Sequence, residues 1–419
     1  MNYPMFPHLE AHSEHPANIG LNFYFDKNGI SEEVLRNYLS RAQNCNVFND
    51  GLGNMEKDIE MLFTTGAKMW SRSYTPWLPG KGEFALHPIM KDTIQRVHEI
   101  DPDIIFENCI FETTVPSMGD FAIPVHVFRA FGLEPEERNF RPEDMCFPDG
   151  RFKDQWGPNT GVPDITQLET QLWFYFRGCM FADLGFECIH FGQIMLMTKD
   201  DVGFVIFDRI VRMIRDYARD HARRGWMLFN AHIYDDRVAA TDRLICDFHM
   251  SPTRGLPPAD AVPHAPAPGN PQEIELRVGH FDSIYLDSPG GVTPSGWRAS
   301  SLPYIVEMDN ACTYEKEWLD TPYWPKQTEW YEGGWWSHDE ISWFSVQPDD
   351  YRRAWLRHAW HWVKNIDGHG YCQMPGHRGG AVRTDDPDEP VKPKIYYAHE
   401  RGDVETMRDI FIQDRLSRG

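Results

Sequence analysis

The sequence has no pair of cysteines at the CxxC spacing, although eight cysteines are spread along its 419 residues. Several of them lie inside apolar, strand-like segments such as FENCIF, FECIHF and LICDFH. Cysteines in such segments are typical of buried, reduced thiols. The pattern therefore argues against a disulfide framework and against a zinc site built from spaced cysteines.

Long apolar runs and excess positive charge are also missing. No stretch of about 18 apolar residues could span a membrane, and the opening MNYPMFPHLEAH lacks the basic and apolar regions of a secretory signal peptide. The chain has 63 Asp and Glu against 41 Lys and Arg, a formal net charge of −22. Phosphates would be repelled, which argues against nucleic acids and anionic membranes as partners. We expect a cytoplasmic protein of enzyme size.

Short apolar segments alternate with amphipathic helical segments, the latter at 31–43, 87–100, 202–225 and 348–368. The strand-like segments are 18–25, 67–74, 103–111, 186–193, 226–233, 243–250, 302–309 and 370–376. Eight strand-like segments that alternate with helical segments predict an α/β fold, the (β/α)8 TIM barrel. An open, doubly wound sheet is the alternative, but YFDKNGISEE stands where that fold carries a glycine-rich phosphate loop. We expect one catalytic domain over residues 17–419, preceded by an N-terminal extension of residues 1–16.

Two long loops follow predicted strands. Residues 113–166 come after the third strand, and the proline-rich residues 251–273 come after the sixth. Loops of this length in a compact domain are usually active-site lids or disordered. Both are expected at the C-terminal rim of the barrel, where barrel enzymes build their active sites.

Polar side chains follow the apolar residues at the C-terminal end of nearly every predicted strand. In IVEMD, Glu307 and Asp309 share a face of the strand, as do Asp247 and His249 in ICDFH. An unpaired buried carboxylate costs several kcal/mol, so these groups must pair with each other, with water or with a ligand. Because the C-terminal ends of barrel strands meet at one mouth, the residues are expected to form a common site.

Paired carboxyls with amide, imidazole and aromatic neighbours suit the cleavage of a glycosidic bond, which requires an acid and a nucleophile or base. The candidate catalytic residues are Glu307, Glu112 and Asp247. The residues expected to bind or orient the substrate are Trp70, Arg72, His190, Gln193, Asn230, His232, His249, Asp309, Trp335, Trp336, Gln373, His377 and Arg378. Trp77 is a further candidate for stacking against a sugar ring.

In these features the chain resembles the barrel-type glycoside hydrolases. Glu307 in YIVEMD is similar to the glutamate of the seventh strand that serves as nucleophile in the largest clan of retaining barrel glycosidases. That clan carries an Asn-Glu pair at the end of the fourth strand, where this chain has HFGQ. The resemblance therefore implies that Glu307 is the nucleophile or base and that the acid comes from elsewhere. Glu112 is the first choice for this acid, followed by Asp247.

Two other functions fit the same residues. A metal-dependent sugar isomerase or epimerase, a lyase or an aldolase could use Glu112, Asp247, His249, Glu307 and Asp309 as ligands of a divalent cation. The sequence has no HExxH motif and no Cys-His ligand spacing, so we expect no metal and no other cofactor for the hydrolase. A barrel that binds sugar without catalysis is the remaining possibility. In each case the partner is a carbohydrate, and the oligomeric state stays open.

Overall fold

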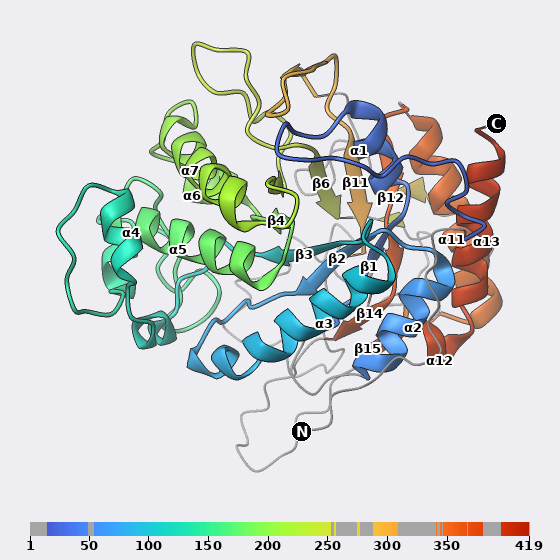
Figure 1. Ribbon diagram of the computed structural model, residues 1–419, viewed down its shortest axis with the longest axis horizontal. Coiled ribbons are helices and arrows are strands. Elements are labelled where there is room, and N and C mark those ends of the chain that lie inside the picture. The colour runs from blue at the N-terminus through green and yellow to red at the C-terminus, as the bar shows by residue number, and fades with distance from the viewer. Residues whose placement is uncertain are drawn as a thin grey trace.

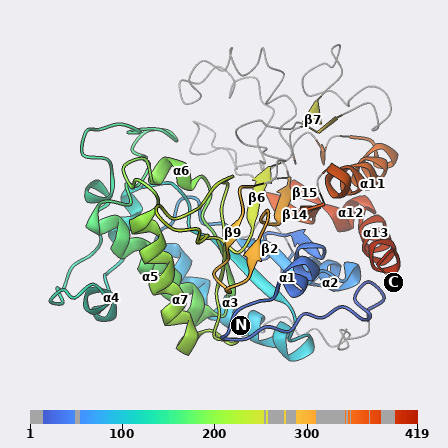
Figure 2. The same ribbon diagram turned by 90° about the horizontal axis from the view of Figure 1, so that it is seen from above.

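The structure is a computed structural model that describes residues 15–48, 54–252, 255–256, 275–276, 288–308, 341, 344–345, 347–366, 368–379 and 395–418. Three residues expected at the site, Asp309, Trp335 and Trp336, lie outside these ranges. So do most of the N-terminal extension and most of the proline-rich loop at 251–273. Strands lie in the middle of the molecule, with α5 (Leu168–Leu184) and α7 (Val205–His221) on one side. Helices α11 (Asp349–Ile366) and α13 (Val404–Leu416) lie on the other side (Figures 1 and 2).

The largest sheet has six strands in the order β13-β1-β2-β3-β4-β5, and every pairing is parallel. Its strands are β1 (Ala42–Asn44), β2 (Met69–Tyr74), β3 (Ile105–Cys109), β4 (Cys188–His190), β5 (Leu228–Asn230) and β13 (Met374–Pro375). A second parallel sheet has the order β12-β11-β6. It contains β6 (His249–Pro252), β11 (Tyr304–Glu307) and β12 (Gly370–Cys372). The chain therefore has an α/β fold built on parallel strands.

The two sheets are connected at both ends. Only Gln373 separates β12, which pairs with β11, from β13, which pairs with β1. At the other end, His232 forms a parallel bridge with Met250 of β6, and the N–H of Met250 donates to the carbonyl of Ala231, 3.0 Å away. Three short antiparallel pairs complete the described strands: β7 (Gly255–Leu256) with β8 (Glu275–Leu276), β9 (Gly291–Val292) with β10 (Arg298–Ala299), and β14 (His377–Gly379) with β15 (Ile395–Tyr397).

Helices occupy most of the connections between the parallel strands. The helices not yet named are α1 (Glu32–Leu39), α2 (Met55–Thr65), α3 (His87–Ile100), α4 (Val125–Ala130), α6 (Ile194–Met197) and α12 (Ala398–Arg401). Short 3-10 turns lie at Lys81–Ala85, Pro116–Asp120 and Pro142–Met145. Local signals fix several ends: the Ser31 side chain accepts from Val34 N–H to begin α1, and Gly66 ends α2 with a left-handed φ of 81°. None of the helices in the described part of the chain has the length and hydropathy that a membrane span requires.

The prediction of a strand at 18–25 is wrong. Those residues form turns and extended chain without a sheet partner, and the first strand is Ala42–Asn44, at the end of the segment predicted as a helix. Phe23 and Phe25 are nevertheless buried, because they pack beside α1 in an apolar cluster. The alternating pattern of that segment therefore reports burial and not sheet pairing. The segment 113–166 also differs from expectation, because it contains α4 and two 3-10 turns and is described throughout.

Two apolar cores divide the molecule. One contains an apolar residue from each of seven parallel strands, together with residues of α1 such as Leu35 and Leu39. The strand residues are Ala42, Met69, Ile105, Cys188, Leu228, Met250 and Ile305. Because they come from both sheets and touch one another, the two sheets face each other across this cluster, and we call the face that carries it the inner face. The larger core lies on the opposite, outer face, against the helices.

The packing of α5 on α7 depends on a glycine. A Cβ at Gly178 would lie 2.6 Å from Cδ1 of Ile214, well inside van der Waals contact. We expect Gly178→Ala to lower the free energy of unfolding by about 1–3 kcal/mol, although alanine is the better helix former. Gly82→Ala is the matched control, because a Cβ there would meet nothing within 4 Å. Denaturant unfolding checks this, and a Gly178→Ala protein as stable as the Gly82→Ala protein would contradict it.

Candidate functional site

A layer of polar side chains lies just beyond the apolar cluster on the inner face. Each member stands two residues after an apolar one, and successive side chains of a strand alternate between faces, so the two share a face. The members are Asn44, Ser71, Glu107, His190, Asn230, Glu307 and Gln373. All seven are almost completely buried. We call this set the polar layer, and it brings together four residues that the sequence predicted for the site: His190, Asn230, Glu307 and Gln373.

Glu307, at the end of β11, is held by the side chains of Arg72 and His232. The Arg72 Nε–H donates to Oε2 over 3.0 Å, and the Arg72 Nη2 group donates to Oε1. His232 Nε2 lies 3.0 Å from the same Oε1. Burial alone would raise the pKa of Glu307, but the Arg72 charge and the hydrogen bonds from His232 and Arg72 hold this pKa well below its usual range. Glu307 is therefore a fixed carboxylate anion at neutral pH.

Arg72 adopts an unusual backbone conformation to reach that carboxylate. Its φ is +54°, in the left-handed region that non-glycine residues rarely occupy. The register of β2 against β3 shifts between Trp70 and Tyr74, which brackets this residue. Strained residues of this kind concentrate at functional sites, where the surrounding contacts hold them in place. Here the contacts include a hydrogen bond of 3.0 Å from the Arg72 backbone N–H to Glu107 Oε2.

A chain of hydrogen bonds fixes the tautomer of His190. Asn230 Nδ2 donates to Glu107 Oε1 over 2.7 Å, which turns the Asn230 oxygen toward His190 Nδ1, also 2.7 Å away. Nδ1 must then carry the proton and donate it. Burial, with the charges of Arg72 and His232, lowers the pKa of His190 well below its usual range, so the ring is neutral. Its unprotonated Nε2 is buried and has no hydrogen-bond partner in the described part of the chain.

Glu112 lies in the loop after β3, but its carboxyl group reaches the end of β4. A Cβ on Gly192 would collide with Glu112 Oε2, so only glycine fits there, and the φ of +64° also favours glycine. Burial raises the pKa of Glu112, and hydrogen bonds from backbone N–H groups, including that of Gln193, with the charges of His232 and Arg72, offset this only in part. Oε2 is buried and has no hydrogen-bond partner among the described residues.

Glu112 and Glu307 therefore share one electrostatic environment. His232 and Arg72 act on the pKa of both carboxyl groups. The outcome is opposite, because Arg72 binds Glu307 directly and leaves Glu112 to the effect of burial. The site thus combines a carboxylate anion with a carboxyl group that is biased toward its protonated form, which is how glycosidases divide the acid and nucleophile roles.

Three half-buried aromatic rings lie beside these groups, and we call them the aromatic cluster: Trp77, Phe111 and Trp156. The ring centroids of Trp77 lie 5.0 Å from Phe111 and 5.4 Å from Trp156. Phe111 is 6.2 Å from the His190 ring, and Trp156 Nε1 donates to the Glu112 carbonyl over 2.9 Å. The sequence suggested Trp77 but neither of the other two. The cluster offers apolar ring surface next to the polar layer, a combination that suits a sugar.

Trp70, expected as a stacking platform, lies elsewhere. Its side chain is completely buried on the outer face, with ring centroids 5.5 Å from Phe63 and 4.8 Å from Phe106. Its Nε1–H donates to the Ala67 carbonyl over 3.1 Å. Trp70 belongs to the core between strands and helices and cannot stack on a substrate.

Asp247 and His249 are also corrected. Asp247 accepts from Arg215 of α7 over 2.7 Å and from the N–H of Phe229 over 2.8 Å, so it ties β5 to the helix layer. His249 Nε2 lies 3.0 Å from Asp236 Oδ1. The period of two puts Asp247, two residues before β6, on the same side of the chain as His249, which begins β6. That side is the outer one, because Phe248 and Met250 belong to the inner cluster.

The other residues that the sequence predicted for the site lie in different places. Gln373 is in the polar layer, and neither of its side-chain polar atoms has a hydrogen-bond partner among the described residues. Arg378 donates weakly to Asn46 Oδ1 over 3.4 Å, and its charge acts on the pKa of Cys109, which Arg72 also contacts. Gln193 is partly exposed at the start of α6. His377 turns to Asp58 of α2 instead.

Sequence reasoning missed Glu107, Asn44 and Ser71. In a continuous strand, Glu107 and Glu112 would lie on opposite faces, but Glu112 lies beyond the end of β3 and its carboxyl group reaches Gly192, after the end of β4. Glu107, Asn44 and Ser71 each lie two residues after an apolar residue of the inner face, so counting forward by two from those apolar residues would have found them. Such counting requires the position of β1, which the sequence pattern hides between α1 and α2.

His190, His232 and Glu307 could also be considered as metal ligands, because one donor atom from each lies within 4.8 Å of the others. The Arg72 guanidinium, however, binds both oxygens of Glu307. A divalent cation there would lie next to a buried positive charge. These donors therefore fit a metal poorly while Arg72 keeps its present contacts.

No model of a known protein family matches this chain. A search of the curated proteins also finds no match.

Proposed function

We propose that the chain is a glycoside hydrolase in which Glu307 is the nucleophile or base and Glu112 is the general acid. The proposal rests on one observation: the pKa of Glu112 is raised and that of Glu307 is lowered, although His232 and Arg72 act on both carboxyl groups. Glycosidic hydrolysis needs such a pair, since one carboxyl group must give a proton to the leaving oxygen while the other is already an anion.

The proposed fold is a closed (β/α)8 barrel over residues 17–419. It is supported by the continuity of the two sheets, since a strand segment interrupted only at Gln373 pairs with β11 on one side and with β1 on the other. The bridge between His232 and Met250 supports closure at the other junction. In such a barrel the polar layer faces the C-terminal mouth, where barrel enzymes bind their substrates.

Each group then has a defined part in the reaction. Glu112 transfers its proton to the glycosidic oxygen as the bond to the anomeric carbon breaks. Glu307 either attacks that carbon, forming a glycosyl-enzyme ester that water then cleaves while Glu112 takes the proton of the water, or it takes a proton from water that attacks the carbon directly. Its anion stabilises the positive charge that develops on the sugar ring. Arg72 and His232 keep Glu307 ionised and oriented. Neutral His190 can accept a hydrogen bond from a substrate hydroxyl at Nε2, and Gln373 can bind another hydroxyl.

A metal-dependent sugar isomerase, epimerase, lyase or aldolase is the competing proposal, and the three donors His190, His232 and Glu307 are its support. It would require Arg72 to leave Glu307. A barrel that binds sugar without catalysis would have no need to divide two carboxyl groups between an ionised and a protonated state. Both are therefore less well supported than the hydrolase.

A substrate screen tests the proposal. The purified protein is incubated with aryl glycosides and with plant and algal polysaccharides, and released aglycone or new reducing ends are measured, with and without a chelator. We expect turnover of at least one substrate, retained in the chelator. Isomerisation or aldol cleavage of free sugars that needs added metal would support the competing proposal, and sugar binding without turnover would support the inactive barrel.

A further inference from the structure

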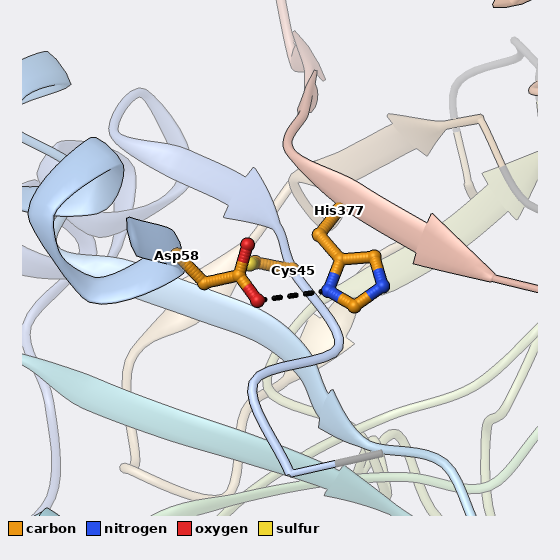
Figure 3. Close-up of side chains that lie close together, drawn as sticks. All are labelled: Cys45, Asp58 and His377. Atoms are coloured by element: carbon orange, nitrogen blue, oxygen red, sulfur yellow. Dashed lines mark hydrogen bonds and ion pairs between the residues drawn. The ribbon is translucent and has the colours of Figure 1, made fainter. Parts of the chain in front are cut away.

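A second cluster of buried, metal-ligating side chains lies away from the polar layer, at the far side of β1. Cys45 follows β1 directly, Asp58 lies on α2 and His377 begins β14 (Figure 3). One donor atom from each lies within 4.8 Å of the other two. All three side chains are almost completely buried, with exposed fractions of 0%, 1% and 1%. The fold thus brings a thiol, a carboxylate and an imidazole together from three separate segments, and Asp58 and His377 are 319 residues apart along the chain.

Among the described residues, no arginine or lysine forms an ion pair with the Asp58 carboxyl group of this cluster. In the described part of the chain, the one ion pair of Asp58 is with His377, whose Nδ1 lies 2.9 Å from Oδ2. The buried aspartates Asp414, Asp403 and Asp101 have a guanidinium or ammonium partner, in Arg41, Arg352 and Lys68. Buried Asp236 has a histidine partner, as Asp58 has, but it also accepts hydrogen bonds from two backbone N–H groups. A buried carboxylate without a cation is strongly unfavourable.

Two buried polar atoms of the cluster also lack hydrogen-bond partners among the described residues. They are Asp58 Oδ1 and His377 Nε2. Figure 3 shows the Cys45 sulfur close to the Asp58 carboxyl group, whose other oxygen bonds His377. One donor atom of each of the three side chains lies within 4.8 Å of the other two. A buried polar atom that is left unpaired, here Asp58 Oδ1, points to a bound species.

We propose that Cys45, Asp58 and His377 bind one divalent metal ion of the zinc class. Thiolate, imidazole and carboxylate together favour Zn²⁺ over Mg²⁺ or Ca²⁺, which prefer oxygen ligands alone. The ion replaces the proton of the Cys45 thiol, which is released to solvent, and it also binds the Asp58 carboxyl group and the His377 ring. Since binding releases a proton, affinity rises with pH.

The position of the ion suggests a structural role. It would join the end of β1 to α2 and to β14, and the Tyr397 ring, 4.5 Å from the His377 ring, covers one side of the cluster. The residues next along the chain, Asn46 and Arg378, contact each other. The ion would therefore hold the segment that leads to Arg378, while chemistry takes place at Glu307. The sequence could not predict this site, because its ligands have no common spacing.

Metal analysis of the full-length protein tests the proposal. The protein is dialysed against Zn²⁺ and then against metal-free buffer, and bound zinc is measured by elemental mass spectrometry. Co²⁺ replacement then reports the ligands, because a cobalt–thiolate bond adds a charge-transfer absorption. We expect about one ion per chain, a thiolate band, and a melting temperature about 2 °C or more above that of the chelator-treated protein.

Two variants assign the site. Cys45→Ser is expected to lose the thiolate band and at least tenfold in zinc affinity. Cys372→Ser, which removes another buried thiol with no charged neighbour acting on its pKa, is expected to change neither. The proposal is overturned if the wild type retains no zinc, or if Cys45→Ser binds zinc as tightly as Cys372→Ser. Neither result bears on glycoside hydrolysis, since none of these residues lies in the polar layer.

Discussion

Replacing Glu307 with glutamine is expected to lower kcat by about 10³-fold or more on any substrate that the screen identifies. Glutamine keeps the size of the side chain but cannot attack the anomeric carbon or take a proton from water. The change also leaves the Arg72 guanidinium buried without its anion, which destabilises the fold. The rate must therefore be measured per folded protein, at a temperature below the melting transition of the variant.

Asp247→Asn is the control for this experiment. It removes the same charge from a carboxylate that is equally buried and also pairs with an arginine, but on the outer face. We expect it to lower the melting temperature and to leave kcat within about twofold, since no step of the reaction uses Asp247. Equal losses of kcat in both variants would mean that Glu307 acts only through stability, and an active Glu307→Gln protein would remove it from the mechanism.

The Glu112→Gln protein is expected to discriminate between leaving groups. On substrates with a sugar leaving group, the loss should be about 10²- to 10⁴-fold, because the departing oxygen receives no proton. On a dinitrophenyl glycoside of the same sugar, the bond-breaking step should be almost unchanged, since that leaving group departs as a stable anion. Single-turnover kinetics on both substrates measures the difference. Equal losses on the two would show that Glu112 positions the substrate and is not the acid.

The Glu112→Gln protein also tests how the activity depends on pH. Burial raises the pKa of Glu112, so the acid is present below this raised value and is lost as the pH rises through it. Glu307 has a pKa well below its usual range and stays ionised across the neutral region. Activity should therefore fall on the alkaline side because of Glu112. Glu112→Gln should remove that alkaline limb, whereas an unchanged limb would assign it to another group.

Much of the site could be predicted from the sequence because strand ends are easy to recognise. The turn from apolar to polar residues in YIVEMD and FECIHF located Glu307 and His190, which are in fact on the inner face. Period alone does not say which face is inner, however, and this ambiguity misplaced Asp247 and His249. It resolves only when the partners are known, since Arg215 of α7 and Asp236 reach these residues from the outer side.

The fold was less accessible where local and distant interactions favour different structures. Residues 18–25 alternate as a strand does, but they pack beside α1 without pairing. The real first strand is only three residues long and follows a helix after two residues. A strand this short has almost no pattern of its own, and its position is fixed by its parallel neighbours β2 and β13. The cluster of Cys45, Asp58 and His377 was hidden for the same reason, because tertiary contacts alone unite it.

The polar layer has a consequence for how this protein tolerates mutation. Asn44, Ser71 and Gln373 occupy interior positions between strands, and five of their side-chain atoms have no hydrogen-bond partner among the described residues. Aliphatic residues at these three positions would enlarge the apolar core, so selection for stability alone would replace these polar side chains. In a mutant library, the amino acids at each position can be ranked once by the heat resistance of the protein and once by its activity. At these three positions we expect the two rankings to be opposite.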